Sequence, residues 1–238
     1  MPEQITLYTG KACPAGQRVE IALVEAGAEF TRYEIDLQDK PDWFTLKINP
    51  VGKIPAISYG GPKVPPDQPS PESVKLAESL VLLEFVADLF PESKLLPKDP
   101  VLRARARFFI DAVNTKFLDG FVAFIIKGEN VDTLYSGAET IQALLPDDKK
   151  FAVSDDFTNA DAAIAPLFIR VIVVLKNDLG KAAPGEGKKA FEVFNSPRFS
   201  KLMDYFKRIE AHESVKSTFD EEYNTKSFEK YFGRTKAP

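Results

Sequence analysis

The sequence contains one cysteine, Cys13, which opens the stretch Cys-Pro-Ala-Gly-Gln-Arg. Pro14 suits the first position of a helix, because the N–H that proline lacks has no partner there. The residue before it is then the N-cap, and its side chain points toward the free backbone N–H groups of the first turn, such as those of Ala15 and Gly16. This position stabilises a thiolate and makes it nucleophilic at neutral pH. We therefore predict that Cys13 is a catalytic nucleophile.

The chemistry predicted for Cys13 is that of a single thiol. Gly16 stands where a Cys-x-x-Cys motif has its second cysteine, so no internal disulfide can form. Lys11 and Arg18 are close in sequence and would add positive potential. The alternative is a buried structural cysteine, because free cysteine is among the most buried residue types. A position at the carboxyl end of a predicted parallel strand, where open α/β sheets hold ligands, favours function.

Composition and charge argue against several other classes of protein. The 238 residues suffice for two modest domains, and 44% hydrophobic residues with 19 Phe supply a large core. The net charge of −4 offers no basic surface to nucleic acid, and a single histidine, His212, gives no basis for a metal site. No apolar run approaches the roughly 20 residues that cross a bilayer, and the first residues do not resemble a signal peptide. We expect a cytoplasmic protein without a membrane partner.

A strand, a helix and a second strand must position the thiol. Residues 5–10 predict a short strand that ends in a turn, and the helix after it stops at Gly27. Residues 29–37 alternate like a strand. A unit of this length forms a parallel pair with a right-handed crossover.

Shorter elements complete the first half of the chain, each bounded by proline or glycine. The helix that follows the last strand has apolar positions that can face a sheet. The expected elements are a short helix from about residue 41, a strand at 55–59, an exposed loop at 60–71, a strand at 74–77 and a helix from 78 or 79 that Pro91 ends.

Beyond this point long helical periodicities replace the strand patterns. We place one domain at residues 1–92, a linker at 93–98 and an all-helical domain at 99–238. The expected helices cover residues 101–127, 131–145, 159–177, 197–211 and 227–232.

The helix expected at 159–177 should run through the middle of the second domain, because it is apolar nearly all round. Thr158 and Asp161 predict a capping box at its start. Pro166 inside it predicts a kink or a local hydrogen-bond defect.

Four segments resemble the cytosolic glutathione transferases and, within them, the Omega class. Residues 13–18 match the Cys-Pro-x-x-Gln/Glu-Arg motif of that class. Residues 40–57 are similar to its Lys-Pro-Glu-Trp-Phe segment followed by Asn-Pro-x-Gly-x-Val-Pro, residues 76–86 to its Glu-Ser pair and helix, and residues 158–161 to the start of its central helix. The resemblance implies an α/β plus all-α fold. A thioredoxin-like N-terminal domain precedes an all-helical glutathione transferase domain, with a glutathione site between them.

The resemblance also implies which residues hold glutathione. Pro55 is expected in cis, so that the backbone of Ile54 pairs with the cysteinyl part. Glu78 and Ser79 are expected to hold the γ-glutamyl end, and Lys40 to reach the glycyl carboxylate. Taken singly, Glu78 and Ser79 could also be a plain helix cap. Pro55 could begin an edge strand, and Lys40 could be an ordinary surface lysine. The expected binding set is Lys40, Lys53, Ile54, Pro55, Glu78 and Ser79.

The chain departs from better-known Omega members at two places. Ala15 and Gly16 replace a Phe-Ala pair, which predicts a wider rim beside the sulfur, and residues 60–71 look like an insertion. Both features resemble the Omega-like transferases of wood-decay fungi, which have broad pockets and bind plant-derived aromatics. A hydrophobic-substrate site is expected from Ala15, Phe109, Phe117 and Phe121.

Most glutathione transferases use Tyr or Ser to stabilise the thiolate of glutathione, whereas a cysteine thiolate attacks directly. We therefore expect a glutathione-dependent thiol transferase that removes glutathione from conjugates and disulfides through a Cys13–glutathione mixed disulfide, with dehydroascorbate reduction as a further activity. One alternative is a non-catalytic ligandin for apolar aromatic compounds. Another is a non-catalytic interaction domain, against which the intact cysteine argues. The family implies glutathione as co-substrate, small aromatic molecules as partners, a role in detoxification and a homodimer.

Overall fold

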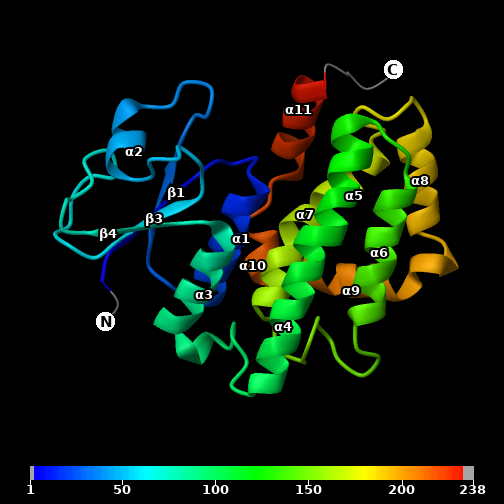
Figure 1. The fold of residues 1–238 in the computed structure, drawn as a ribbon, viewed down its shortest axis with the longest axis horizontal. Helices are drawn as coiled ribbons and strands as arrows, with labels where there is room; N and C mark the ends of the chain where they lie inside the picture. Colours follow the sequence, from blue (N-terminus) through cyan, green and yellow to red (C-terminus); the bar gives the residue numbers. More distant parts are fainter. Residues whose placement is uncertain (1–2, 233–238) are drawn as a thin grey trace. The chain divides into compact units, whose positions relative to one another are not determined.

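The computed structural model describes residues 3–232, and internal contacts divide the chain into two compact units, Met1–Leu96 and Pro97–Pro238 (Figure 1). We call them unit 1 and unit 2. Unit 1 contains a four-stranded sheet with helices, whereas the described part of unit 2 is helical. The predicted α/β plus all-α fold is confirmed.

The sheet of unit 1 has the strand order β2-β1-β3-β4. β1 and β2 are parallel, as the sequence predicted, and the other two pairs are antiparallel. β1 is buried along its whole length, because it has a neighbouring strand on each side and helices on both faces. The strands are β1 Ile5–Thr9, β2 Thr31–Glu34, β3 Ala56–Tyr59 and β4 Val74–Ala77.

One face of the sheet packs against α2 (Asp42–Lys47). Tyr8 and Ala56 are opposite each other on neighbouring strands and form a buried cluster with Phe44 and Ile48 of this helical segment. Aromatic side chains in edge-on contact enlarge the cluster, because Trp43 and Tyr33 both meet the ring of Tyr8.

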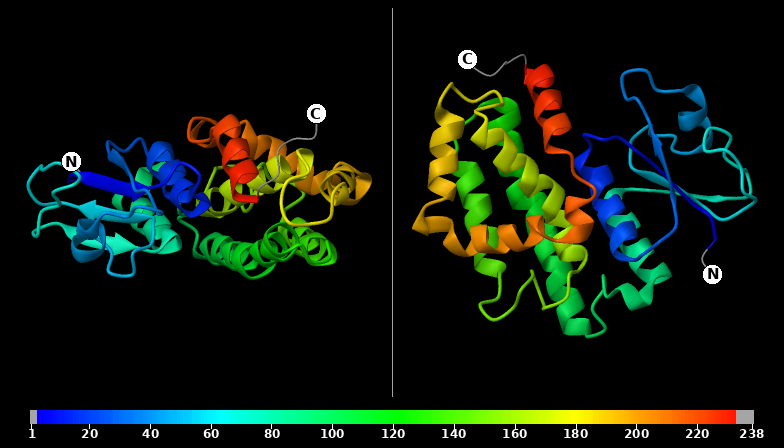
Figure 2. Two further views of the ribbon diagram at one scale, coloured as in Figure 1. Left: turned by 90° about the horizontal axis from the view of Figure 1, so that it is seen from above. Right: turned by 180° about the vertical axis from the view of Figure 1, so that it is seen from behind.

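The other face carries α1 (Pro14–Glu25) and α3 (Ser79–Leu89), which lie side by side (Figures 1 and 2). Successive residues of a strand point to opposite faces, so the neighbours of Tyr8 in β1, Leu7 and Thr9, point to this side. Gly27 follows the end of α1 with a φ of 61°, a conformation that suits glycine and stops the helix as predicted.

The loop at residues 60–71 contains no helix or strand, as the sequence predicted, but it is tied to the sheet. The hydroxyl of Tyr8 donates a hydrogen bond to the carbonyl of Pro66 at 2.8 Å. Burial, with smaller contributions from Tyr33 and Asp67, raises the pKa of Tyr8 to about 12, so the phenol stays protonated and keeps donating.

Unit 2 begins with a continuous helical stretch over residues 100–127, in which α4 and α5 alternate with two π-helical segments. The predicted helix at 101–127 is therefore confirmed. Among the described residues, no helix is long and apolar enough to cross a membrane. The elements of unit 2 are α4 Pro100–Ala112, η2 Val113–Phe117, α5 Leu118–Phe121, η3 Val122–Lys127, α6 Asp132–Leu144, α7 Asn159–Lys176, α8 Glu186–Phe194, η4 Pro197–Phe199, α9 Ser200–Glu210, α10 Glu213–Lys216 and α11 Glu221–Phe232.

The helices α8 and α10 were not predicted from the sequence, and α11 is longer than predicted. The start of α8 could not be predicted because Gly185 and Gly187 lie there, and glycine normally disfavours helix. The carboxylate of Asp178 accepts hydrogen bonds from both glycine N–H groups, at 2.7 and 3.0 Å. Asp178 therefore caps the start of α8 although it is seven or more positions earlier in the sequence. No residue next to α8 in sequence could have revealed this contact.

The central helix of unit 2 is α7, which is buried along nearly all of its length, as predicted. The predicted capping box is confirmed, because Thr158 accepts from the backbone of Ala160 and Asp161 accepts from that of Thr158 at 2.8 Å. α7 continues through Pro166, and the guanidinium of Arg170 donates to the carbonyl of this proline at 2.8 Å.

Asp161 connects the start of α7 to two other segments. Its carboxylate accepts hydrogen bonds from the backbone of Ala152, from the hydroxyl of Tyr205 in α9, and from the backbone and hydroxyl of Thr158. Burial and the charge of Asp161 raise the pKa of Tyr205 well above its usual value, so the phenol remains a donor.

We expect Asp161→Ala to lower the free energy of unfolding by about 3–5 kcal/mol, because it leaves several buried donors without an acceptor. Tyr205→Phe removes one donor only and should lower it by about 1–2 kcal/mol. Urea denaturation followed by circular dichroism measures both. Equal losses from the two variants would contradict the central role of the carboxylate.

Candidate active site

Cys13 is the N-cap of α1, as predicted, and Pro14 is the first residue of the helix. Its backbone is extended, with φ −79° and ψ 114°, and its N–H donates to the carbonyl of Gly10 at 2.8 Å. The sulfur accepts a hydrogen bond from the backbone N–H of Gly16 at 3.3 Å. The thiol is partly exposed. A sulfur in this position faces the positive end of the helix dipole and remains open to a reactant.

The first turn of α1 lies directly on the end of β1. A Cβ atom on residue 16 would collide with the side-chain oxygen of Thr9 and would lie 3.3 Å from its Cβ. Thr9 is fully buried and β-branched, so it has little freedom to move away. A second cysteine at position 16 would meet the same obstacle. The single-thiol character of the site therefore has a packing cause.

A hydrogen-bonded turn presents Ile54 next to the cysteine. The peptide bond between Ile54 and Pro55 is cis, as the resemblance implied. The side chain of Asn49 donates to the carbonyl of Lys53 at 2.8 Å and so fixes the backbone just before this bond. A Cβ added to Gly10 would lie 3.0 Å from Cδ1 of Ile54 and 3.9 Å from Cβ of Cys13, so both side chains border the same glycine.

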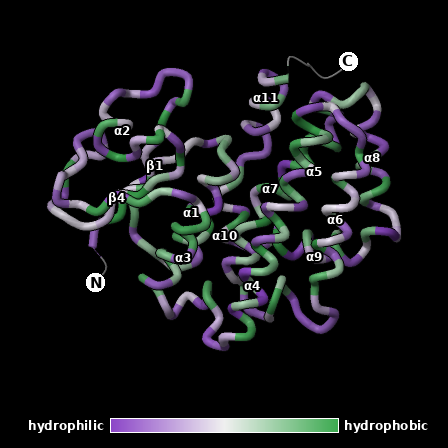
Figure 3. Tube along the Cα trace, in the orientation of Figure 1, coloured by the Kyte–Doolittle hydropathy of each residue, from purple (hydrophilic) through white to green (hydrophobic). Residues whose placement is uncertain are grey.

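Lys40 lies over the same turn, whereas Lys53 has an exposed side chain. Lys40 ends the mostly hydrophilic loop at residues 36–40, between β2 and α2 (Figure 3). Its ammonium would lie 2.9 Å from a Cβ on Gly52, whose φ is +69°. Glycine is required there both by the backbone and by the lysine above it.

Glu78 and Ser79 form the start of α3. Glu78 has a φ of 73°, which is uncommon for a residue with a side chain and is a frequent mark of functional sites. Its side chain is exposed, whereas Ser79 is 9% exposed. The hydroxyl of Ser79 accepts a hydrogen bond from Nη1 of Arg18 at 3.4 Å.

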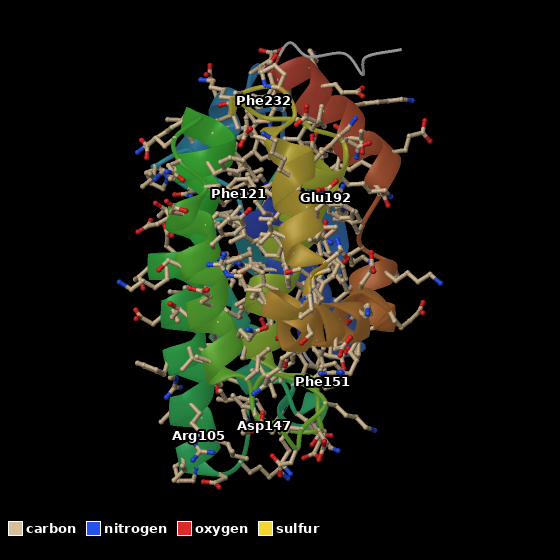
Figure 4. All side chains as sticks on the ribbon, turned by 90° about the vertical axis from the view of Figure 1, so that its right-hand side faces the viewer. Arg105, Phe121, Asp147, Phe151, Glu192 and Phe232 are labelled. Carbon is tan, nitrogen blue, oxygen red and sulfur yellow. The ribbon has the colours of Figure 1, made fainter. Side chains whose placement is uncertain are left out.

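The residues expected at a hydrophobic site fall into separate environments. Ala15 is half-buried in the first turn of α1. Phe109 is in unit 2, where it lines a mainly apolar cavity of about 510 Å³ together with Phe108 and Arg105 of α4. Phe117 and Phe121 belong to the packed interior of unit 2, where Figure 4 shows Phe121 among the side chains enclosed by the helices.

Sequence reasoning missed two contributions to the site in unit 1. It treated Arg18 only as nearby positive charge, although the side chain is buried and reaches Ser79. It did not identify Asn49 as the support of the turn. The Asn-Pro-x-Gly spacing was the available signal for the turn.

Comparisons with known proteins show the family to which the chain belongs. A family model described as "Glutathione S-transferase, N-terminal domain" matches residues 7–94. The crystal structure of glutathione transferase Omega 1C from Trametes versicolor is 55% identical, covers 99% of this chain and 100% of its own, and has a TM-score of 0.95. Omega 2S of the same organism, in complex with 2,4-dihydroxybenzophenone, is 45% identical over 94% of this chain and 97% of its own, with a TM-score of 0.90. A probable glutathione S-transferase from Solanum tuberosum is 34% identical over 66% of this chain and 69% of its own length.

With such similarity over nearly the whole of both chains, this protein belongs to the glutathione transferase family. The Omega-class relatives and the cysteine motif at residues 13–18 place it with the Omega class, which confirms the resemblance drawn from the sequence. These relatives support a glutathione-dependent transferase.

We expect Gly16→Ala to lower the free energy of unfolding by about 1–3 kcal/mol, because the added methyl group overpacks the contact with Thr9. Replacing Thr9 by Ala in the same chain should recover most of this loss. Denaturant titration of the two single variants and the double variant measures the coupling. A Gly16→Ala variant as stable as the parent would contradict the packing cause.

Proposed function

We propose that the protein is a glutathione-dependent thiol transferase that removes glutathione from disulfides and conjugates. The observation that carries this proposal is the state of Cys13, a partly exposed thiol at a helix N-cap, with its sulfur accepting the N–H of Gly16. A thiolate there is a nucleophile without a histidine base.

The reaction with a glutathionyl disulfide has two exchange steps. The thiolate of Cys13 attacks the glutathionyl sulfur, a Cys13–glutathione disulfide forms, and the other sulfur leaves as a thiolate that takes a proton from water. The thiolate of a second glutathione then attacks the glutathionyl sulfur of this intermediate. Oxidised glutathione is released and the Cys13 thiolate is regenerated. The outside thiol is required because Cys13 is the only cysteine of the chain.

Conjugates and dehydroascorbate fit the same cycle. In an aryl ketone conjugate, attack on the glutathionyl sulfur breaks the carbon–sulfur bond, and the electron pair stays on carbon as an enolate that is then protonated. The thiolate of a second glutathione then attacks the glutathionyl sulfur of the Cys13–glutathione disulfide, so oxidised glutathione is again the product. Dehydroascorbate enters the cycle differently, because the Cys13 thiolate adds to one of its carbonyl carbons. Attack of a first glutathione thiolate on the Cys13 sulfur then breaks the carbon–sulfur bond, leaves its electron pair on ascorbate and forms the Cys13–glutathione disulfide, which a second glutathione resolves as above.

Glutathione is proposed to bind along the residues that unit 1 gathers near Cys13. The backbone of Ile54, before cis Pro55, would pair with the cysteinyl part. The start of α3 at Ser79 offers unpaired N–H groups to the γ-glutamyl carboxylate, and the exposed carboxylate of Glu78 suits its ammonium. Lys40 and the exposed Lys53 are the cations available for the glycyl carboxylate.

The test is intact-mass measurement after incubation with oxidised glutathione. We expect the parent protein to gain one glutathione adduct, which reduced glutathione then removes, and Cys13→Ser to gain none. Because the chain has no other cysteine, the variant is a complete control. Absence of the adduct on the parent protein, or its presence on Cys13→Ser, would refute the mechanism.

A second candidate function is the binding of apolar aromatic compounds, and the cavity of unit 2 favours it. Its volume of about 510 Å³ is within the usual range for small-molecule sites, and its lining is mainly apolar. Phe108 is 62% exposed at this cavity, whereas the neighbouring Phe109 is buried. A related Omega transferase was crystallised with 2,4-dihydroxybenzophenone.

We expect 2,4-dihydroxybenzophenone to bind the parent protein and Cys13→Ser equally, and Phe108→Ala about tenfold more weakly, because an aromatic contact is lost. Isothermal titration calorimetry measures all three. Tyr231→Ala, which removes another exposed aromatic side chain, is the matched control. Failure of the parent protein to bind would remove this second function, and equal binding by Phe108→Ala would remove the cavity as its location.

A further inference from the structure

Arg18 is a buried cation inside the candidate active site. Only 8% of its surface is exposed, although arginine is almost never fully buried unless it is paired. It lies on α1, where long side chains lean toward the helix N-terminus. Its side chain therefore extends over the first turn, toward the end at which Cys13 is the N-cap.

Its guanidinium reaches a second helix start. Nη1 of Arg18 donates to the hydroxyl of Ser79, the first residue of α3, at 3.4 Å. The N-termini of α1 and α3 both carry positive partial charge. Anions are favoured where two helix N-termini and a guanidinium meet, and the proposed function supplies two of them, the Cys13 thiolate and the γ-glutamyl carboxylate.

The electrostatics of Arg18 agree with this geometry. Burial lowers the pKa of Arg18 to about 10, and the negative charge of the Cys13 thiolate opposes this decrease. The guanidinium therefore remains charged at neutral pH. The guanidinium and the Cys13 sulfur are therefore close enough for their charges to interact.

We propose that Arg18 is a positioning residue that serves both parts of the site, stabilising the Cys13 thiolate and orienting the Ser79 hydroxyl toward the γ-glutamyl carboxylate of glutathione. The inference rests on the proposed function and deepens it. It gives Arg18 a role in the second exchange step as well. When the second glutathione attacks the glutathionyl sulfur, the disulfide bond breaks and its electron pair returns to the Cys13 sulfur. A stabilised thiolate is the better leaving group.

Three variants separate the two roles. Arg18→Met removes the charge and the hydrogen bond, and Arg18→Lys keeps the charge but loses the planar donor group. Ser79→Ala removes the hydroxyl that accepts from Arg18 and that would contact the γ-glutamyl carboxylate. The first readout is the rate at which iodoacetamide alkylates Cys13, measured as a function of pH. Only the thiolate reacts, so this rate follows the deprotonated fraction of Cys13. The second is the affinity for S-methylglutathione, which has no free thiol and reports binding alone.

We expect the alkylation curve of Arg18→Met to move to higher pH, with about tenfold slower alkylation at pH 6, and its affinity for S-methylglutathione to fall about tenfold. Arg18→Lys and Ser79→Ala should keep the alkylation curve of the parent protein and lose affinity. Arg103→Met, which removes a partly exposed arginine of α4 in unit 2, is the control for lost charge and should change neither. Circular dichroism checks folding, and Arg18→Gln replaces Arg18→Met if the methionine variant does not fold.

An unchanged alkylation curve in the charge-removing variant would overturn the first role. Parent-like affinity in both Arg18→Lys and Ser79→Ala would overturn the second. Alkylation needs no glutathione and no turnover. A shifted curve in Arg18→Met would therefore support the electrostatic role even if the parent protein formed no glutathione adduct, which would refute only the thiol-transfer function.

Discussion

The close contact between the first turn of α1 and the end of β1 is the constraint on which the candidate site depends. Gly16 lies so near Thr9 that no side chain fits between them. This contact fixes where α1 begins relative to the sheet, and therefore where its N-cap residue holds the sulfur. It also decides the chemistry, because the position that would hold the second thiol of a redox pair is the position that must stay without a side chain. Geometry and reactivity thus follow from one packing requirement.

Two sources of positive charge act near the Cys13 sulfur, the N-terminus of α1 and the guanidinium of Arg18. The free N–H groups of α1 act at hydrogen-bond distance, through Gly16, and the buried guanidinium of Arg18 adds a full charge behind them. A helix dipole alone is weakened by solvent at a partly exposed site, whereas a cation that is itself buried is screened much less. Because Arg18 also reaches Ser79, this electrostatic support extends to the start of α3. The link lies entirely within unit 1, where α1 and α3 pack side by side on one face of the sheet.

Much of this arrangement could be predicted from the sequence, because it rests on local rules. The N-cap before proline, the parallel β1–β2 pair and the capping box at Thr158 each depend on neighbouring residues or on simple periodicity. The parts that could not be predicted depend on distant residues. The start of α8 is satisfied by Asp178 across a loop, and the loop at 60–71 is held by Tyr8 through a hydrogen bond that spans 58 positions. Arg18 is the same case within the site, since its partner Ser79 is 61 positions away.

The arginine also shows why residue type and spacing alone underestimate a site. On an amphipathic helix an arginine normally marks the solvent face, where its charge is hydrated and its effect on a neighbour is small. In this fold the turn that carries Arg18 is covered by α3, so the same side chain is buried and its field is strong. The helical period places Arg18 beside Ala15 and Ala22 on the apolar face, but the helix that covers it begins some sixty residues later, so the local sequence does not show how deeply the side chain is buried. How strongly a charged side chain acts on its neighbours therefore depends on how the fold packs around it. The packing of α3 on α1 makes Arg18 part of the site.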